Sequence, residues 1–281
     1  MRDGTGLPLG VVTRSFRTRS NEETARLLEQ GGFTCTELCL SQTDSAYWVY
    51  NGRSDMASFD DSRAREVLQC YQSRGIEVVA VGVFTNLLEP NDREREANLA
   101  YFERHMQIAS LGGVRYVSTE CGFIPGRRGV QAESYESAFS RLRESLQELM
   151  VRSRGHGVAV ALEPCVLDVV PSAKRMRDLL EQIGAPELRV LLDPANLIAN
   201  SSEEDMFSYL GPHVAYFHAK DRRVNDTYGR IVGEGDIDWR LWLSLYHKRT
   251  EGIPILLDYV TEENYLLVRD RLLEFDRASR R

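Results

Sequence analysis

Residues 189–194 read RVLLDP, an apolar run that ends in a carboxylate followed by proline. Similar short runs rich in Val, Ile and Leu recur along the chain, eight in all. They are residues 9–13, 35–40, 77–84, 116–120, 158–164, 188–194, 214–221 and 254–260. A run that is apolar throughout suits a strand with both faces buried, so the pattern predicts a parallel sheet covered by helices.

The segments between these runs have the period of helices. Residues 135–149 carry an apolar side chain at every third or fourth position, which is one face of a helix. Ser20 with Glu23, and Ser201 with Glu204, form the S-x-x-E pattern of a capping box, in which a hydroxyl and a carboxylate satisfy free amides reciprocally. Each pair therefore predicts the start of a helix.

Strand followed by helix, repeated eight times, predicts a single (β/α)8 barrel. The 281 residues give about 35 per repeat, which is the size of one right-handed βαβ step. No linker rich in Gly, Ser or Pro interrupts the chain, so we expect one α/β domain over residues 1–281. An open doubly wound sheet is the alternative, but no GxGxxG follows the first strand.

The composition excludes several classes of protein. The formal charge of -7 disfavours a nucleic-acid scaffold, and no apolar run reaches the ~20 residues that a membrane span needs. The five cysteines are odd in number and contain no CxxC, which argues against a disulfide framework or a thiolate zinc site. We expect a soluble cytoplasmic protein with a small-molecule partner, and a homo-oligomer is compatible with the sequence.

Polar residues end the last four predicted strands. They are Glu163, Asp193, His218 and Asp258. The strands of a (β/α)8 barrel bring their C-terminal ends together at the active-site face. Carboxylates gathered there around an imidazole would repel one another unless a cation neutralised them. We therefore expect a divalent metal ion, and three oxygen ligands with one nitrogen favour Mn, Mg or Co, with Zn as an alternative.

Other candidates lie near the same face. Glu37 and Glu120 are at the ends of the second and fourth strands and point either into the barrel or toward its mouth. Trp48 and Tyr50 follow the second strand, where aromatic side chains either wall a pocket or pack back onto the barrel. Lys220 shares a strand face with His218, so it is a rival Schiff-base nucleophile or a contact that balances charge.

Two arginine pairs follow predicted strands. Arg127–Arg128 and Arg222–Arg223 could hold a carboxylate or phosphate by bidentate hydrogen bonds. Only three of the 35 basic residues are lysines, so arginine is common everywhere in this chain. An exposed surface position is therefore the expected interpretation of both pairs.

Over nearly its whole length the chain resembles the sugar phosphate isomerase/epimerase family, the xylose-isomerase-like barrels. The resemblance rests on LGVVTRSF, TELCL, ALEP, LLDPAN, FHAKD, GEGDIDW and PILLDYV, in this order along the chain. The family includes ketose 3-epimerases, hydroxypyruvate isomerases and inosose dehydratases. It also includes apurinic endonucleases, whose additional histidines this chain lacks.

The resemblance implies a metal site of Glu, Asp, His and Glu on strands five to eight. This set carries over onto Glu163, Asp193 and His218, but Asp258 stands where the family usually has Glu. Epimerases of the family use the first and last carboxylates as an acid/base pair, which implies Glu163 and Asp258 as catalytic residues. Asn196 stands where such epimerases often carry a histidine.

These residues predict an isomerase or epimerase of a sugar, sugar phosphate or related polyhydroxy carbonyl compound. A divalent metal would assist proton transfer at the carbon next to the carbonyl. Glu120, Asn196, Lys220 and Trp48 are the candidates for binding the carbohydrate substrate. Two alternatives remain open: a metal-dependent dehydratase of inosose or dehydroshikimate type, and a non-catalytic sugar-binding barrel.

Overall fold

The computed structural model describes residues 6–124, 126–127, 129 and 131–281. Eight parallel strands close into a barrel in chain order, which confirms the predicted (β/α)8 fold and excludes an open sheet. The strands are β1 (Leu9–Val12), β2 (Cys35–Leu38), β3 (Glu77–Gly82), β4 (Tyr116–Glu120), β5 (Ala159–Glu163), β6 (Leu188–Leu192), β7 (Val214–Ala219) and β8 (Ile255–Leu257).

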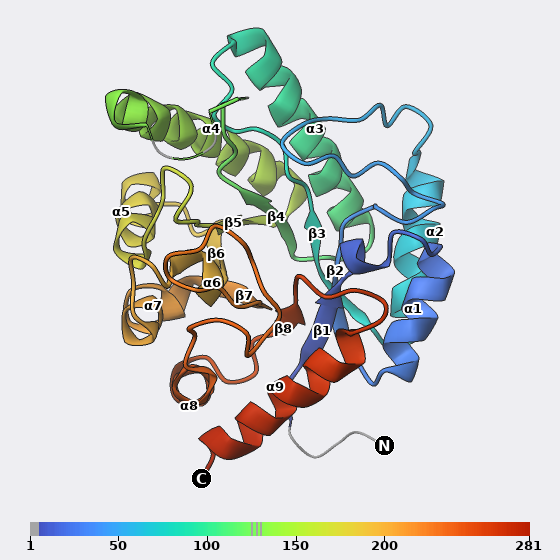
Figure 1. Cartoon of the computed structure of the whole chain (residues 1–281). Coiled ribbons are helices and arrows are strands. Elements are labelled where there is room, and N and C mark those ends of the chain that lie inside the picture. Colours follow the sequence, from blue (N-terminus) through green and yellow to red (C-terminus); the bar gives the residue numbers. More distant parts are fainter. Residues whose placement is uncertain (1–5, 125, 128, 130) are drawn as a thin grey trace.

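Helices surround the strands (Figure 1). They are α1 (Asn21–Gln30), α2 (Asp61–Gln72), α3 (Asp92–Leu111), α4 (Tyr135–His156), α5 (Ala173–Ile183), α6 (Pro194–Leu197), α7 (Glu203–Leu210), α8 (Trp239–Arg249) and α9 (Tyr265–Ser279). In the described part of the chain, three short 3-10 helices lie in the connections between strands and helices: η1 (Thr13–Phe16), η2 (Ala132–Ser134) and η3 (Gly211–His213). The short α6 begins directly after β6, so the chain turns away from the barrel at the residue that follows this strand.

The first and last strands close the barrel. Leu9 pairs with Ile255 and Val11 pairs with Leu257, so the segments that follow β1 and β8 emerge side by side. A smaller apolar cluster inside the barrel includes Leu191 and Leu256, while a larger one lies between strands and helices. The packed interior leaves the C-terminal ends of the strands as the place for a functional site.

One predicted helix cap is confirmed and the other is wrong. Ser20 Oγ accepts from the Glu23 amide, and the Glu23 carboxylate accepts from the Ser20 amide at 2.9 Å. At the second site the cap is Ser202, which accepts from the amide three residues later. Ser201 is buried, and its hydroxyl instead accepts from the Ala173 amide at 2.9 Å, so it is already used to fix the start of α5.

All five cysteines are free thiols, as their number and spacing predict, and four of them are buried. In the described part of the chain, no helix combines the length and the apolar character needed to cross a bilayer.

Candidate metal centre

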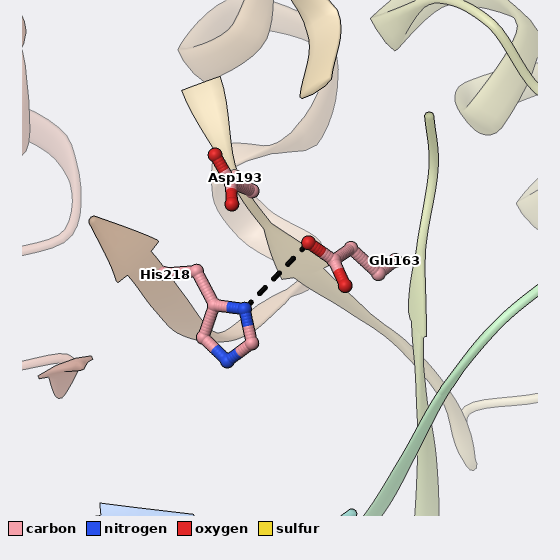
Figure 2. A group of neighbouring side chains, drawn as sticks. All are labelled: Glu163, Asp193 and His218. Carbon is pink, nitrogen blue, oxygen red and sulfur yellow. Dashed lines mark ion pairs between the residues drawn. The ribbon is translucent and has the colours of Figure 1, made fainter. Parts of the chain in front are cut away.

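Three predicted ligands meet at the mouth of the barrel. Glu163 ends β5, Asp193 follows β6, and His218 lies in β7. All three side chains are buried, and one potential ligand atom of each lies within 4.8 Å of the others. Figure 2 shows the imidazole of His218 and the carboxylate of Glu163 directed toward each other. The structure therefore brings together three of the four residues that the sequence singles out as ligands.

The two ring nitrogens of His218 have different surroundings. Nε2 lies 2.8 Å from Glu37 Oε2, whereas Nδ1 lies 3.6 Å from Glu163 Oε1. Among the described residues, this buried Nδ1 has no hydrogen-bond partner. Burial alone would lower the pKa of His218, but the Glu37 and Glu163 carboxylates raise it to about 10. A positive charge is thus favoured at Nδ1, and either a proton or a metal ion can supply this charge.

Glu37 positions His218 from inside the barrel. Its buried carboxylate also accepts from Tyr216 Oη at 2.7 Å and from Ser118 Oγ at 3.2 Å. Gly82 makes room for it, because a Cβ at that position would lie 2.3 Å from Glu37 Oε1. A carboxylate on the far nitrogen of an imidazole is the usual support of a metal-binding histidine. The strand-end position of Glu37 left two orientations open, and the structure shows the inward one.

Lys220 lies among the carboxylates, on the same face as His218 as strand alternation predicts. Its Nζ is 2.7 Å from Asp193 Oδ2, 3.3 Å from Asp258 Oδ2 and 3.5 Å from Glu163 Oε1. Burial would lower the pKa of Lys220, but these carboxylates raise it well above its ordinary value. Lys220 is therefore a permanent cation here, which argues against a neutral amine that would form a Schiff base.

Asp258 is shared between two cations. Arg14 Nη2 donates to its Oδ1 at 2.6 Å, and its Oδ2 faces Lys220 and lies 4.0 Å from His218 Nδ1. Against the effect of burial, Arg14 and Lys220 hold the pKa of Asp258 well below its usual range. The shorter side chain thus leaves Asp258 beside the three-residue group, with one oxygen bound to a guanidinium.

The charges of this cluster do not balance. Four carboxylates are buried here, namely Glu37, Glu163, Asp193 and Asp258. Lys220 and Arg14 are the permanent cations that form ion pairs with three of them. With a neutral imidazole, two negative charges remain, which is the charge that one divalent cation neutralises. The donor set of oxygens and one imidazole nitrogen also fits such an ion.

Asn196 and Arg222 form a second support around Glu163. Asn196 Nδ2 donates to Glu163 Oε1 at 2.7 Å, and Arg222 Nη2 donates to Asn196 Oδ1 at 3.3 Å. Arg222 is buried, so the expected surface position is wrong for it, whereas Arg223 and Arg127 are exposed as expected. Arg222 is drawn inward because it follows the buried β7, directly after the anchored Asp221. Arg128 lies outside the described residues.

An aromatic wall stands beside the cluster. Tyr50 Oη donates to Glu120 Oε2 at 2.6 Å. The half-buried Trp48 stacks on Tyr50, with ring centroids 6.1 Å apart, and meets the Phe84 ring edge-on at 5.9 Å. Burial and the charge of Glu163 raise the pKa of Glu120. Trp48 and Tyr50 also pack against the apolar cluster inside the barrel, so these loop aromatics pack back onto the barrel and lie beside Glu120.

The GEGDIDW segment has a structural role. Asp221 accepts from Trp239 Nε1 and from the Gly233 amide, both at 2.9 Å, and so holds the loop before α8. At Gly235 a Cβ would lie 2.1 Å from Asp221 Oδ1, so the loop needs glycine there. Asp238 caps α8 as the sequence predicts.

Solved structures share this fold. They include the 3-keto-D-glucoside 4-epimerase YcjR from E. coli (13% identity, TM-score 0.76), with 95% of this chain and 99% of that chain covered. A D-psicose 3-epimerase with D-tagatose from Clostridium cellulolyticum H10 has 16% identity and a TM-score of 0.75, covering 97% and 99%. The IolI protein with a zinc atom has 18% identity and a TM-score of 0.72, covering 97% and 96%.

At these identities the likeness shows a common fold, the scaffold that sugar epimerases also use. No curated protein matches the chain significantly. The family model described as xylose isomerase-like TIM barrel matches residues 25–275, which is most of the barrel. The chain belongs to the xylose isomerase-like TIM barrel family.

Proposed function

We propose that this protein is a divalent-metal-dependent isomerase or epimerase of a sugar or related polyhydroxy carbonyl compound. One observation carries the proposal: the buried Nδ1 of His218 lacks a hydrogen-bond partner among the described residues and faces Glu163 in a cluster with an excess of negative charge. Buried polar atoms are almost always hydrogen-bonded, so a buried nitrogen without a hydrogen bond beside carboxylates indicates the position of a cation.

Glu163, Asp193 and His218 would hold the ion, with Asp258 beside them. Manganese, magnesium or cobalt suits this oxygen-rich set, and zinc is the alternative. When bound, the ion would supply a Lewis acid that polarises adjacent carbonyl and hydroxyl oxygens of the substrate. The likeness to the zinc-containing IolI structure and to sugar epimerases supports this assignment.

Glu163 is our candidate for moving the proton at the carbon next to the carbonyl. Burial would raise its pKa, but Lys220 and His218 lower it to about 2, so Glu163 is in the ionised form of a base at neutral pH. The amide of Asn196 fixes the direction of its carboxylate. Asp258, held by Arg14, is the second carboxylate that can act as acid or base.

The surrounding side chains would orient the substrate. Lys220 and Glu120 carry groups that bind hydroxyl or carbonyl oxygens, and Trp48, which contacts Arg17 and Tyr50, would border the substrate. The substrate class follows from this mixture of charged groups and aromatic rings at one mouth. The relatives named above as sugar epimerases support a carbohydrate.

Glu163→Gln tests the proposal. We expect the wild-type protein, purified and loaded with Mn²⁺, to bind about one ion per chain and to isomerise or epimerise a member of a ketose panel. The substitution keeps the size of the side chain but removes the base, so turnover should fall about 10²- to 10⁴-fold. Metal content is measured in parallel by elemental analysis.

Glu204→Gln is the matched control, because Glu204 is an exposed glutamate on α7, away from the cluster. Turnover by Glu163→Gln equal to that of the control would overturn the role of Glu163. A conjugated product that absorbs in the ultraviolet would instead identify a dehydratase. Ligand binding with no turnover of any sugar would identify a non-catalytic barrel.

A further inference from the structure

A cavity of about 310 Å³ lies next to the candidate metal centre, between the segments that follow β1 and β8. It is lined by Arg14, Ser15, Arg17, Asp258, Tyr259 and Val260. Its position follows from barrel closure, because β1 pairs with β8 and brings η1 beside the residues after Leu257. The cavity and the metal centre share Asp258, whose Oδ2 faces Lys220 and His218.

The two arginines of the cavity present their charges to it. Arg14 is partly exposed, and its ion pair with Asp258 uses only Nη2. Arg17 is exposed and has no ion pair among the described residues. The guanidinium of Arg17 lies 4.4 Å from the centre of the Trp48 ring, and that of Arg14 lies 5.5 Å from the centre of the Phe84 ring. Stacking on aromatic rings holds a guanidinium in place while its edge remains available to donate.

Neighbouring acids neutralise only part of this charge. Asp258 is shared between Arg14 and Lys220, so the charge of Arg14 is matched. Further out, Glu262 is ion-paired with Arg19 at 2.8 Å, and the exposed Glu263 lines an adjoining pocket. Arg17 therefore contributes a positive charge that no ion pair among the described residues balances, although the chain as a whole has a formal charge of -7. An exposed cation without an ion-pair partner, placed beside a functional site, attracts an anionic ligand.

Two further observations fit a ligand at this place. Tyr259 has φ 60°, a backbone conformation that is rare outside glycine and concentrates at binding sites. Its ring lies 5.2 Å from Lys220 Nζ, so it lines both the cavity and the metal centre. The buried indole Nε1 of Trp48, whose ring supports Arg17, has no hydrogen-bond partner within the described part of the chain.

We propose that this cavity binds an anionic group of the substrate, a carboxylate or a phosphate, so that the enzyme acts on an acidic sugar derivative. The inference rests on the proposed function of the adjacent metal centre and names its substrate class. Arg14 and Arg17 donate to the anion, and the polyhydroxy carbonyl part of the same molecule extends past Asp258 to Glu163. The arginine pairs after β4 and β7 are not needed for this contact.

Binding of three matched sugars tests the proposal. D-Fructose, D-fructose 6-phosphate and D-fructuronate share one carbon skeleton and differ in the group at the sixth carbon. We expect calorimetry on the Mn²⁺-loaded protein to show that at least one anionic member binds at least about tenfold more tightly than fructose. The tighter of the two anions assigns phosphate or carboxylate as the natural group.

Arg17→Gln should reduce this preference to about twofold or less. Arg26→Gln removes the same charge from an exposed position on α1 and should retain the preference. The proposal is overturned if neither anion is preferred over fructose in the wild-type protein, including the case in which none of the three binds. It is also overturned if the preference survives Arg17→Gln.

The same protein samples separate this result from that of the proposed function. An anion preference without turnover of any ketose leaves the cavity assigned and contradicts the isomerase. Turnover of ketoses without an anion preference leaves the isomerase and contradicts the cavity.

Discussion

At the scale of single residues, Lys220 gives the candidate site its unusual character. Its ammonium group lies within 3.5 Å of three carboxylates, so part of the charge that a metal ion would neutralise is already balanced by the chain. A buried cation that loses its partners, or buried carboxylates that lose their cation, cost several kcal/mol. Lys220 therefore couples the stability of the metal-free protein to the metal centre.

Lys220→Met should expose this coupling. Without the ammonium group, Glu163, Asp193 and Asp258 are left close together, so we expect the metal-free variant to lose about 3–5 kcal/mol of stability. Mn²⁺ should then raise its Tm by more than it raises that of the wild type, which thermal unfolding with and without the ion measures. An equal shift of both proteins would show that lysine and metal do not act on the same carboxylates.

Glu37 is the residue whose role the sequence could not assign. Its place at a strand end allowed either orientation, and its partners His218 and Tyr216 are about 180 residues away along the chain. The sequence does not indicate the role of Arg14 for the same reason, since Arg14 meets Asp258 across 244 residues. Glu163 and His218, in contrast, are predictable as site residues from the sequence, because each is a polar residue in an apolar strand.

At the scale of elements, Gly82 at the end of β3 tests the support of His218. Gly82→Ala would place a Cβ 2.3 Å from Glu37 Oε1 and so displace the carboxylate that holds the imidazole. We expect a loss of about 10- to 100-fold in metal affinity, the effect of disturbing such a partner, measured by titration with Mn²⁺.

Gly155→Ala is the matched control. Gly155 is an exposed residue of α4, and a Cβ there would have nothing within 4 Å. Alanine should leave metal affinity unchanged, because Gly155 lies in the last turn of α4 and an added Cβ meets no neighbour. Equal metal affinity in both variants would contradict the role given to Glu37.

Helix α3 contributes a pH dependence of stability through His105. Burial lowers the pKa of this histidine to about 4, and Nδ1 lies 2.9 Å from the Tyr101 carbonyl oxygen. The unfolded chain takes up a proton near pH 6.5, whereas the folded chain does so only near pH 4. Stability from this group is thus complete above pH 6.5 and falls by about 3 kcal/mol as the pH drops to about 4.

His105→Gln removes this titration. In urea unfolding, we expect the stability of the variant to change less steeply between pH 6.5 and pH 4 than that of the wild type. Parallel curves for the two proteins would show that His105 takes up its proton equally in both states.

The start of α7 is likewise decided by local contacts, because Ser202, one residue after the predicted cap, accepts the capping hydrogen bond.

At the scale of the whole molecule, closure of the barrel creates side-chain contacts that the sequence does not predict. Periodicity and strand-end chemistry predicted eight strands, their order and the face that carries Glu163, Asp193 and His218. A closed barrel implies that the segments after β1 and β8 are neighbours, but the pattern does not predict which of their side chains meet, because Arg14 and Asp258 are 244 residues apart. The arginine cavity and the ion pair of Asp258 with Arg14 both depend on this long-range packing.

The most direct test of the metal centre is an anomalous difference map from crystals soaked in Mn²⁺. We predict one strong peak at the mouth of the barrel, within coordination distance, about 2.0–2.3 Å, of Glu163, Asp193 and His218 Nδ1. A map with no peak at these three side chains, or with manganese bound only elsewhere, would contradict the account.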